Sequence, residues 1–234
     1  MERDYCINHN RDKVIYDRRE LIRCNECLEL EQALITQKNR HNAFSVEREY
    51  INSKLYHDKF EKLPLNKNVQ EAVYREAGRL LEFIDSLEEN QMVEERLVAL
   101  NARTGQFLVD NFDREGTSCK TGFNEDEHAI IDRCPDSIVL IHNHSLNGMP
   151  SGQDLLSYLH NEKIRVSLIA CHDGTLYAIY GVKKEFEETY KKILNENKLR
   201  TNDIEVAKRL TMDELYPLNA TLSARHKIFN VQEL

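Results

Sequence analysis

An apolar run that ends in two histidines, SIVLIHNH at residues 137–144, sets the narrowest limits on how this chain folds. A short apolar run of this kind predicts a buried strand. Successive side chains of a strand point to opposite faces, so His142 and His144 project in the same direction. The strand therefore brings two imidazoles toward one point.

A loop and a helix start follow this strand. Residues 145–150 include a glycine and a proline that let the chain turn back, and Ser151 and Asp154 have the spacing of a first helical turn. Ser-x-x-Asp is also a capping pattern in its own right, and a His-x-His pair on a strand can be incidental. Two histidines, one carboxylate and an open fourth position are the ligand set of a catalytic zinc. Their combination here favours a zinc site at His142, His144 and Asp154, with Ser151 at the cap.

The middle of the chain alternates helix and strand patterns. Apolar residues at three- and four-residue steps predict helices, and short apolar runs bounded by turns predict strands. We expect helices at 69–87, 124–131, from 151 onward and at 186–199, and strands at 96–101, 106–112, 137–144 and twice within 166–181. This order predicts an α/β fold with a mixed β-sheet flanked by helices.

Four segments are expected along the 234 residues. They are a zinc-knuckle-like segment at 1–30, a helical linker region at 31–64, a catalytic domain at 65–200 and a C-terminal tail at 201–234. Pro64 ends a stretch without glycine or proline and marks the boundary before the catalytic domain. The tail has a few apolar residues that could pack on the core or on a partner.

The pattern His142-x-His144 followed by Ser151-x-x-Asp154 resembles the motif of the JAMM (MPN-type) zinc metalloproteases. That family includes deubiquitinating isopeptidases and the bacterial RadC-like proteins. The resemblance covers about residues 68–195, and four chemically distinct positions match in order. Six residues separate His144 from Ser151, where the family usually has seven. The resemblance implies that His142, His144 and Asp154 bind zinc and that Ser151 helps to stabilise a tetrahedral oxyanion.

The family also implies a glutamate at the start of an upstream strand. The segment VEERLVALN at 93–101 offers Glu94 and Glu95, and strand alternation lets only one of them face the metal. We assign Glu95 as the general base, with Glu94 as the reserve and Glu115 as a third candidate. Zinc would acidify the attacking water, and Glu95 would take its proton and pass it to the departing amine.

A second metal pattern lies near the N-terminus. Cys6-x-x-His9 is followed after fourteen residues by Cys24-x-x-Cys27. Two such pairs supply the four nitrogen and sulfur ligands of a closed structural zinc site. The alternative is that they are ordinary residues of a mostly helical segment.

Composition narrows the partners and the compartment. The formal net charge of −8 argues against general nucleic-acid binding, which relies on a positive surface. No apolar stretch is long enough to cross a bilayer, and the first residues lack the apolar core of a signal peptide. We therefore expect a cytoplasmic protein without a membrane partner, whose six cysteines are reduced or bound to metal.

The expected function is a zinc metallopeptidase that hydrolyses peptide or isopeptide bonds. Its partner would be a protein substrate, with ubiquitin-like conjugates among the candidates, and an oligomer is compatible with the sequence. The alternative is a non-catalytic MPN-type scaffold or a RadC-like DNA-associated protein. The complete ligand set favours the enzyme, because family members used only as scaffolds commonly lack ligands.

Overall fold

The computed structural model describes residues 46–87, 94–114, 121–145 and 147–234. Its helices are α2 (Arg48–Ile51), α3 (Lys54–Phe60), α4 (Lys67–Asp85), α5 (Glu125–Arg133), α6 (Gly152–His160), α7 (Lys184–Arg200) and α8 (Ile204–Thr221). Its strands are β1 (Leu97–Asn101), β2 (Phe107–Asp110), β3 (Ile138–His144), β4 (Ile164–Cys171), β5 (Leu176–Val182) and β6 (Phe229–Glu233). Among these residues, no helix has the length and apolarity needed to span a bilayer.

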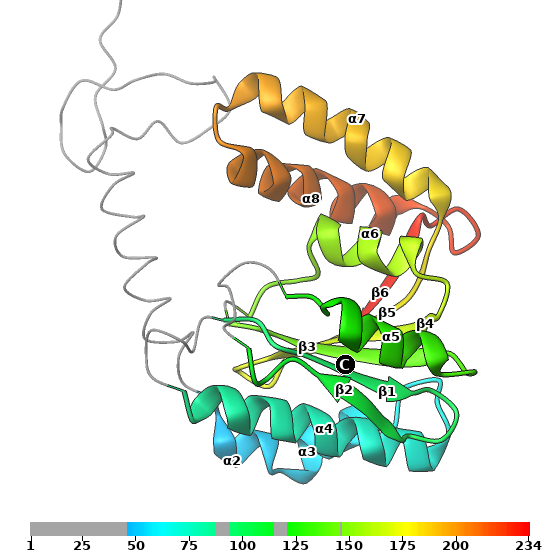
Figure 1. Ribbon diagram of the computed structural model, residues 1–234. Helices are drawn as coiled ribbons and strands as arrows, with labels where there is room; N and C mark the ends of the chain where they lie inside the picture. Colours follow the sequence, from blue (N-terminus) through cyan, green and yellow to red (C-terminus); the bar gives the residue numbers. More distant parts are fainter. Residues whose placement is uncertain (1–45, 88–93, 115–120, 146) are drawn as a thin grey trace, which may run out of the picture.

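The strands form one mixed sheet in the order β2-β1-β3-β4-β5-β6, with helices on both faces (Figure 1). β3 and β4 are parallel, whereas the other neighbouring pairs are antiparallel. The predicted α/β class with a mixed, helix-flanked sheet is therefore confirmed. A parallel pair needs a crossover connection, and α6 supplies it between β3 and β4. The carboxyl end of β3 is thus followed directly by the start of α6, an arrangement that often forms ligand sites in α/β proteins.

One face of the sheet is covered by α4, with α2 and α3 beside it (Figure 1). Val139 and Ile141 of β3 share a buried cluster with the apolar stripe of α4. Tyr56 and Phe60 of α3 are buried in the same cluster. The described part of the expected helical linker region therefore shares the core of the sheet.

The other face carries α5, α6, α7 and α8 (Figure 1). Ile138 of β3 packs with Ile131 of α5, and Leu155 of α6 packs with Phe186 of α7 and Leu215 of α8. Because side chains alternate along β3, this is also the face onto which its two histidines project.

The structure gives the C-terminal tail a defined place that the sequence analysis did not assign. Residues 204–221 form α8, and β6 pairs antiparallel with β5 at the edge of the sheet. Pro217 lies inside α8, where proline lacks an N–H donor and is disfavoured. The tail is therefore an integral part of the hydrophobic core, through Leu215 and Phe229.

This packing predicts a large loss of stability when the β6 aromatic is truncated. Phe229 is 2% exposed and meets Phe186 and Tyr216 edge-to-face, with centroids 5.6 and 5.3 Å away. Phe229→Ala should lower the free energy of unfolding by about 3–5 kcal/mol, as expected for a buried phenylalanine, measured by urea denaturation. Leu199→Ala is the control, because Leu199 is 90% exposed. Equal effects of the two changes would contradict a core role for the tail.

Candidate metal centre

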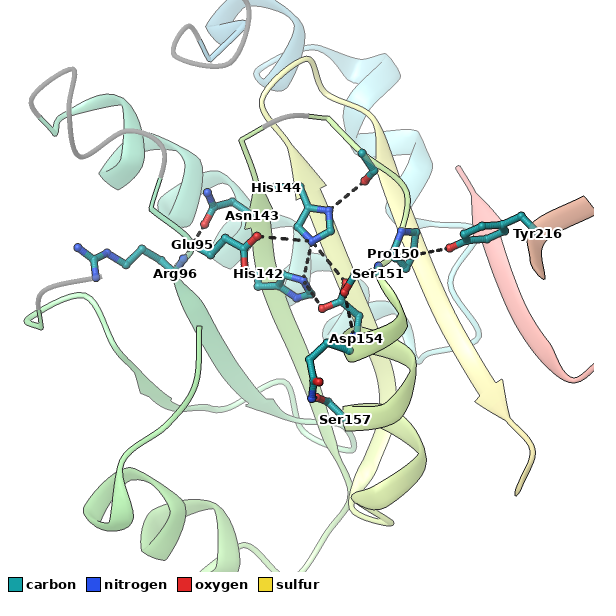
Figure 2. Close-up of polar contacts among 12 residues, drawn as sticks. Glu95, Arg96, His142, Asn143, His144, Pro150, Ser151, Asp154, Ser157 and Tyr216 are labelled. Atoms are coloured by element: carbon teal, nitrogen blue, oxygen red, sulfur yellow. Dashed lines mark hydrogen bonds and ion pairs between the residues drawn. The ribbon is translucent and has the colours of Figure 1, made fainter. Parts of the chain in front are cut away.

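Two imidazoles converge at the carboxyl end of β3. His142 and His144 both project from the α6 side of the sheet, and their Nε2 atoms lie 3.2 Å apart (Figure 2). His142 is 5% exposed and the His144 side chain 12%. The strand alternation inferred from the sequence thus brings both rings to one point.

The first turn of α6 supplies a carboxylate to the same point. Asp154 Oδ1 lies 3.3 Å from His142 Nε2, and Asp154 Oδ2 lies 3.5 Å from His144 Nε2 (Figure 2). Asp154 also completes a capping box, since its Oδ2 accepts the Ser151 N–H at 2.6 Å and the Ser151 hydroxyl accepts the Asp154 N–H at 3.2 Å. Asp154 therefore completes the helix capping box and also faces the two imidazoles, so the two interpretations of Ser-x-x-Asp are compatible.

These three side chains form a group that could hold a metal ion. One ligand atom from each can be chosen so that all lie within 4.8 Å of one another. Bonds of about 2.0–2.2 Å from a tetrahedral zinc imply ligand-to-ligand distances of roughly 3.3–3.6 Å. The two Nε2 atoms lie 3.2 Å apart, and the nearer Asp154 oxygen of each imidazole lies 3.3 Å from His142 Nε2 (Oδ1) and 3.5 Å from His144 Nε2 (Oδ2), distances close to that range. Two nitrogens and one oxygen also leave a fourth position open.

Contacts around the group orient its ligand atoms. His144 Nδ1 lies 3.0 Å from the carbonyl oxygen of Gly148, which can only accept a hydrogen bond. Nδ1 therefore carries a proton, and in the neutral ring Nε2 has its lone pair toward the site. Such an outer contact commonly fixes a metal-binding histidine.

Of the two neighbouring glutamates, Glu95 is the one that faces the group. Its Oε1 lies 3.9 Å from His144 Nε2 (Figure 2). The Glu94 carboxylate instead accepts a hydrogen bond from Arg96 Nη2 at 2.6 Å. Glu95 stands two residues before β1, so the strand that was expected from residue 96 begins one residue later.

Burial and charge act in opposite directions on the two carboxyls. Burial raises the pKa of Glu95, and the nearby imidazoles offset this only in part. Burial also disfavours the ionised form of Asp154, but His142 and His144 outweigh it and hold the pKa of that carboxyl well below its usual range. Asp154 is therefore suited to binding a cation, and Glu95 to accepting a proton.

Asn147 lies in the short loop between β3 and α6, next to Gly148. Asn147 has φ 54°, in the left-handed region, and its side-chain oxygen accepts the Asp173 N–H at 3.2 Å. At the end of the loop, Tyr216 of α8 donates to the Pro150 carbonyl oxygen at 2.8 Å (Figure 2). The C-terminal helix thus holds the segment that leads into Ser151, a role that the sequence did not reveal.

Two pockets lie in this region of the structure. The first, of about 280 Å³, has His142 and Asp154 in its wall and apolar side chains such as Leu97 and Leu140 in its lining. The second, of about 530 Å³, is lined by the loop that leads into α6, including Ser151, and by residues of helices α7 and α8. Of these two pockets, only the first is lined by residues of the His142, His144 and Asp154 group.

Several predicted residues lie outside the described part of the chain. They are Cys6, His9, Cys24 and Cys27 of the N-terminal metal pattern, and Glu115. The structural zinc site stays a prediction.

Comparisons of the chain with protein-family models, with curated proteins and with solved structures find no match.

Proposed function

We propose that this chain is a zinc-dependent metallopeptidase that hydrolyses peptide or isopeptide bonds. One observation carries the proposal: His142, His144 and Asp154 converge with an open side, and the Glu95 carboxylate stands 3.9 Å from His144 Nε2. Three ligands beside an additional carboxylate are the parts that hydrolysis of an amide needs.

The donor set fits zinc. Imidazole nitrogens and a carboxylate oxygen are common zinc ligands, and three protein ligands leave a position for water or substrate. When bound in such a site, zinc lowers the pKa of water toward neutrality and polarises a carbonyl group.

The chain's own residues then perform the proton transfers. Glu95 accepts a proton from the attacking water as the new carbon–oxygen bond forms, and its burial favours that uptake. It returns the proton to the departing amine nitrogen as the carbon–nitrogen bond breaks. The Ser151 hydroxyl oxygen accepts the Asp154 N–H, and its O–H donates a hydrogen bond to the oxyanion.

The pocket beside the group supports a polypeptide substrate. It adjoins His142 and Asp154 and has apolar side chains in its lining, so a side chain next to a scissile bond has room there. The resemblance to JAMM proteases adds isopeptide conjugates and ubiquitin-like modifiers as the substrates to try first.

The test is hydrolysis under control of the metal. The zinc-loaded chain is incubated with a panel of ubiquitin-like fusions and isopeptide-linked conjugates, and products are read by mass spectrometry. We expect cleavage that stops with 1,10-phenanthroline, continues with its non-chelating isomer, and returns when zinc is added.

Two outcomes would count against the proposal. Cleavage that persists after chelation would exclude a metal-dependent reaction. If every fusion and conjugate of the panel stays uncleaved while zinc is bound, the non-catalytic scaffold would be favoured.

A further inference from the structure

Asn143 stands between the two histidines but points to the opposite face of β3, where it is fully buried. Its side-chain oxygen accepts the Arg96 N–H at 2.7 Å. Its Nδ2 donates to the Glu94 carbonyl oxygen at 3.1 Å and lies 3.3 Å from His172 Nε2. The first two contacts are hydrogen bonds to the backbone of Arg96 and Glu94, the residues on either side of Glu95.

These side-chain hydrogen bonds hold the chain where the pairing between β1 and β3 ends. The ladder between β1 and β3 ends with Leu97 opposite His142. The next position along β3 is Asn143, and its side chain binds the backbone of Arg96 (Figure 2). The segment that bears Glu95 is therefore tied by a side chain to the strand that bears the histidines.

We propose that Asn143 is a positioning residue that fixes the Glu95 carboxylate beside the His142, His144 and Asp154 group. The inference rests on the proposed function, because it concerns the general base of that reaction. A single strand then sets both the metal ligands and, through Asn143, the place of the base. Such placement matters because a displacement of about 1 Å can cost roughly a hundredfold in rate.

The hydrogen-bonding pattern requires a primary amide. One acceptor must meet the Arg96 N–H while two donors meet the Glu94 carbonyl and His172 Nε2. An amide supplies all three, whereas a carboxylate supplies acceptors only and leucine, of similar size, supplies none. Asn143→Leu should therefore release the backbone of Glu94 and Arg96 without changing the volume of the site much.

The first experiment reads the backbone and needs no activity. Amide hydrogen exchange is followed by NMR on the full chain. In Asn143→Leu, the Arg96 amide should exchange about ten-fold faster, the worth of one hydrogen bond, while amides inside β1 keep their protection. Asn143→Ser, whose hydroxyl is too short to span both backbone groups, should act in the same way if the leucine variant folds poorly.

The second experiment reads catalysis on whichever conjugate the unchanged chain cleaves. Asn143→Leu should keep its zinc and lower kcat by roughly ten- to a hundredfold, with KM within about twofold. If Asn143 acts through the base, the same change made on top of Glu95→Gln should cost almost nothing further.

Asn219 of α8 provides a matched control on another element of the fold. Its side chain accepts the Ile228 N–H at 2.8 Å and donates to the Phe229 carbonyl at 2.9 Å. Like Asn143, it is a buried amide that makes two hydrogen bonds to the backbone. Asn219→Leu should lower stability but leave the Arg96 exchange rate and kcat unchanged.

The outcomes separate the two proposals. Unchanged exchange at Arg96, or faster exchange with full kcat, would overturn the positioning role. A loss of kcat that adds fully to that of Glu95→Gln would also overturn it. If the unchanged chain hydrolyses nothing, the proposed function fails, and Asn143 then positions no general base, whatever the exchange rates show.

Discussion

Glu95→Gln should leave zinc bound while lowering hydrolysis by roughly two to four orders of magnitude, the usual worth of a positioned proton transfer. The amide keeps the size of the carboxylate but cannot take a proton from water. The carboxylate stands 3.9 Å from His144 Nε2, and Glu95 is not one of the three residues that could hold the metal. The measurements are kcat on a cleavable conjugate and zinc content by elemental analysis.

Glu94→Gln is the matched control for this prediction. The Glu94 carboxylate pairs with Arg96 Nη2 at 2.6 Å instead of facing the imidazoles, so its change should leave kcat close to that of the unchanged chain. Full activity of Glu95→Gln together with loss in Glu94→Gln would exchange the roles of the two residues. If neither change alters hydrolysis, the metallopeptidase proposal fails.

The core strands could be predicted from the sequence because their patterns are local. The run at 137–144 is apolar on both faces, and β3 occupies all of it but the first residue. Both faces of the sheet are covered by helices, which is why the run shows little alternation before its histidines. The capping patterns at Asn124 and Ser151 likewise mark the starts of α5 and α6.

The C-terminal elements could not be predicted because their stability is tertiary. Pro217 lies in the interior of α8 and contradicts a helix on local grounds. The strand β6, FNVQE, buries Phe229 alone and is held by pairing with β5. Phe229 packs on Phe186, which lies before α8 in the sequence, and on Tyr216 of α8, and this tertiary packing stabilises both elements.

The candidate site likewise has a part that could be predicted from local sequence and a part that depends on long-range contacts. The spacing of His142 and His144 on a strand, and of Ser151 and Asp154 on a helix, is local and could be predicted. The hydrogen bonds of Asn143 to the backbone around Glu95 join residues nearly fifty positions apart, so no local pattern predicts them. Strand alternation predicts that Asn143 points away from the face of His142 and His144, but it does not reveal what Asn143 binds there.

Asp154→Asn should remove the metal of this centre while the chain stays folded. The change replaces a charged ligand by a neutral amide among the two imidazoles, although the amide oxygen can still accept the Ser151 N–H and keep the helix cap. We expect zinc affinity to fall by more than the roughly 10- to 100-fold that loss of an outer-shell partner costs. With both predicted sites filled, the unchanged chain should carry about two zinc ions and this variant about one.

Cys27→Ser is the complementary variant, because Cys27 belongs to the N-terminal pattern. It should lose the other zinc and keep hydrolysis of small conjugates, whereas Asp154→Asn should abolish hydrolysis and keep the N-terminal metal. Elemental analysis after dialysis, with thermal unfolding of each variant, distinguishes the two sites. One zinc in the unchanged chain that survives Cys27→Ser but not Asp154→Asn would remove the N-terminal site and leave the catalytic centre in place. Zinc that survives Asp154→Asn at full affinity would mean that this carboxylate is a helix cap and not a ligand.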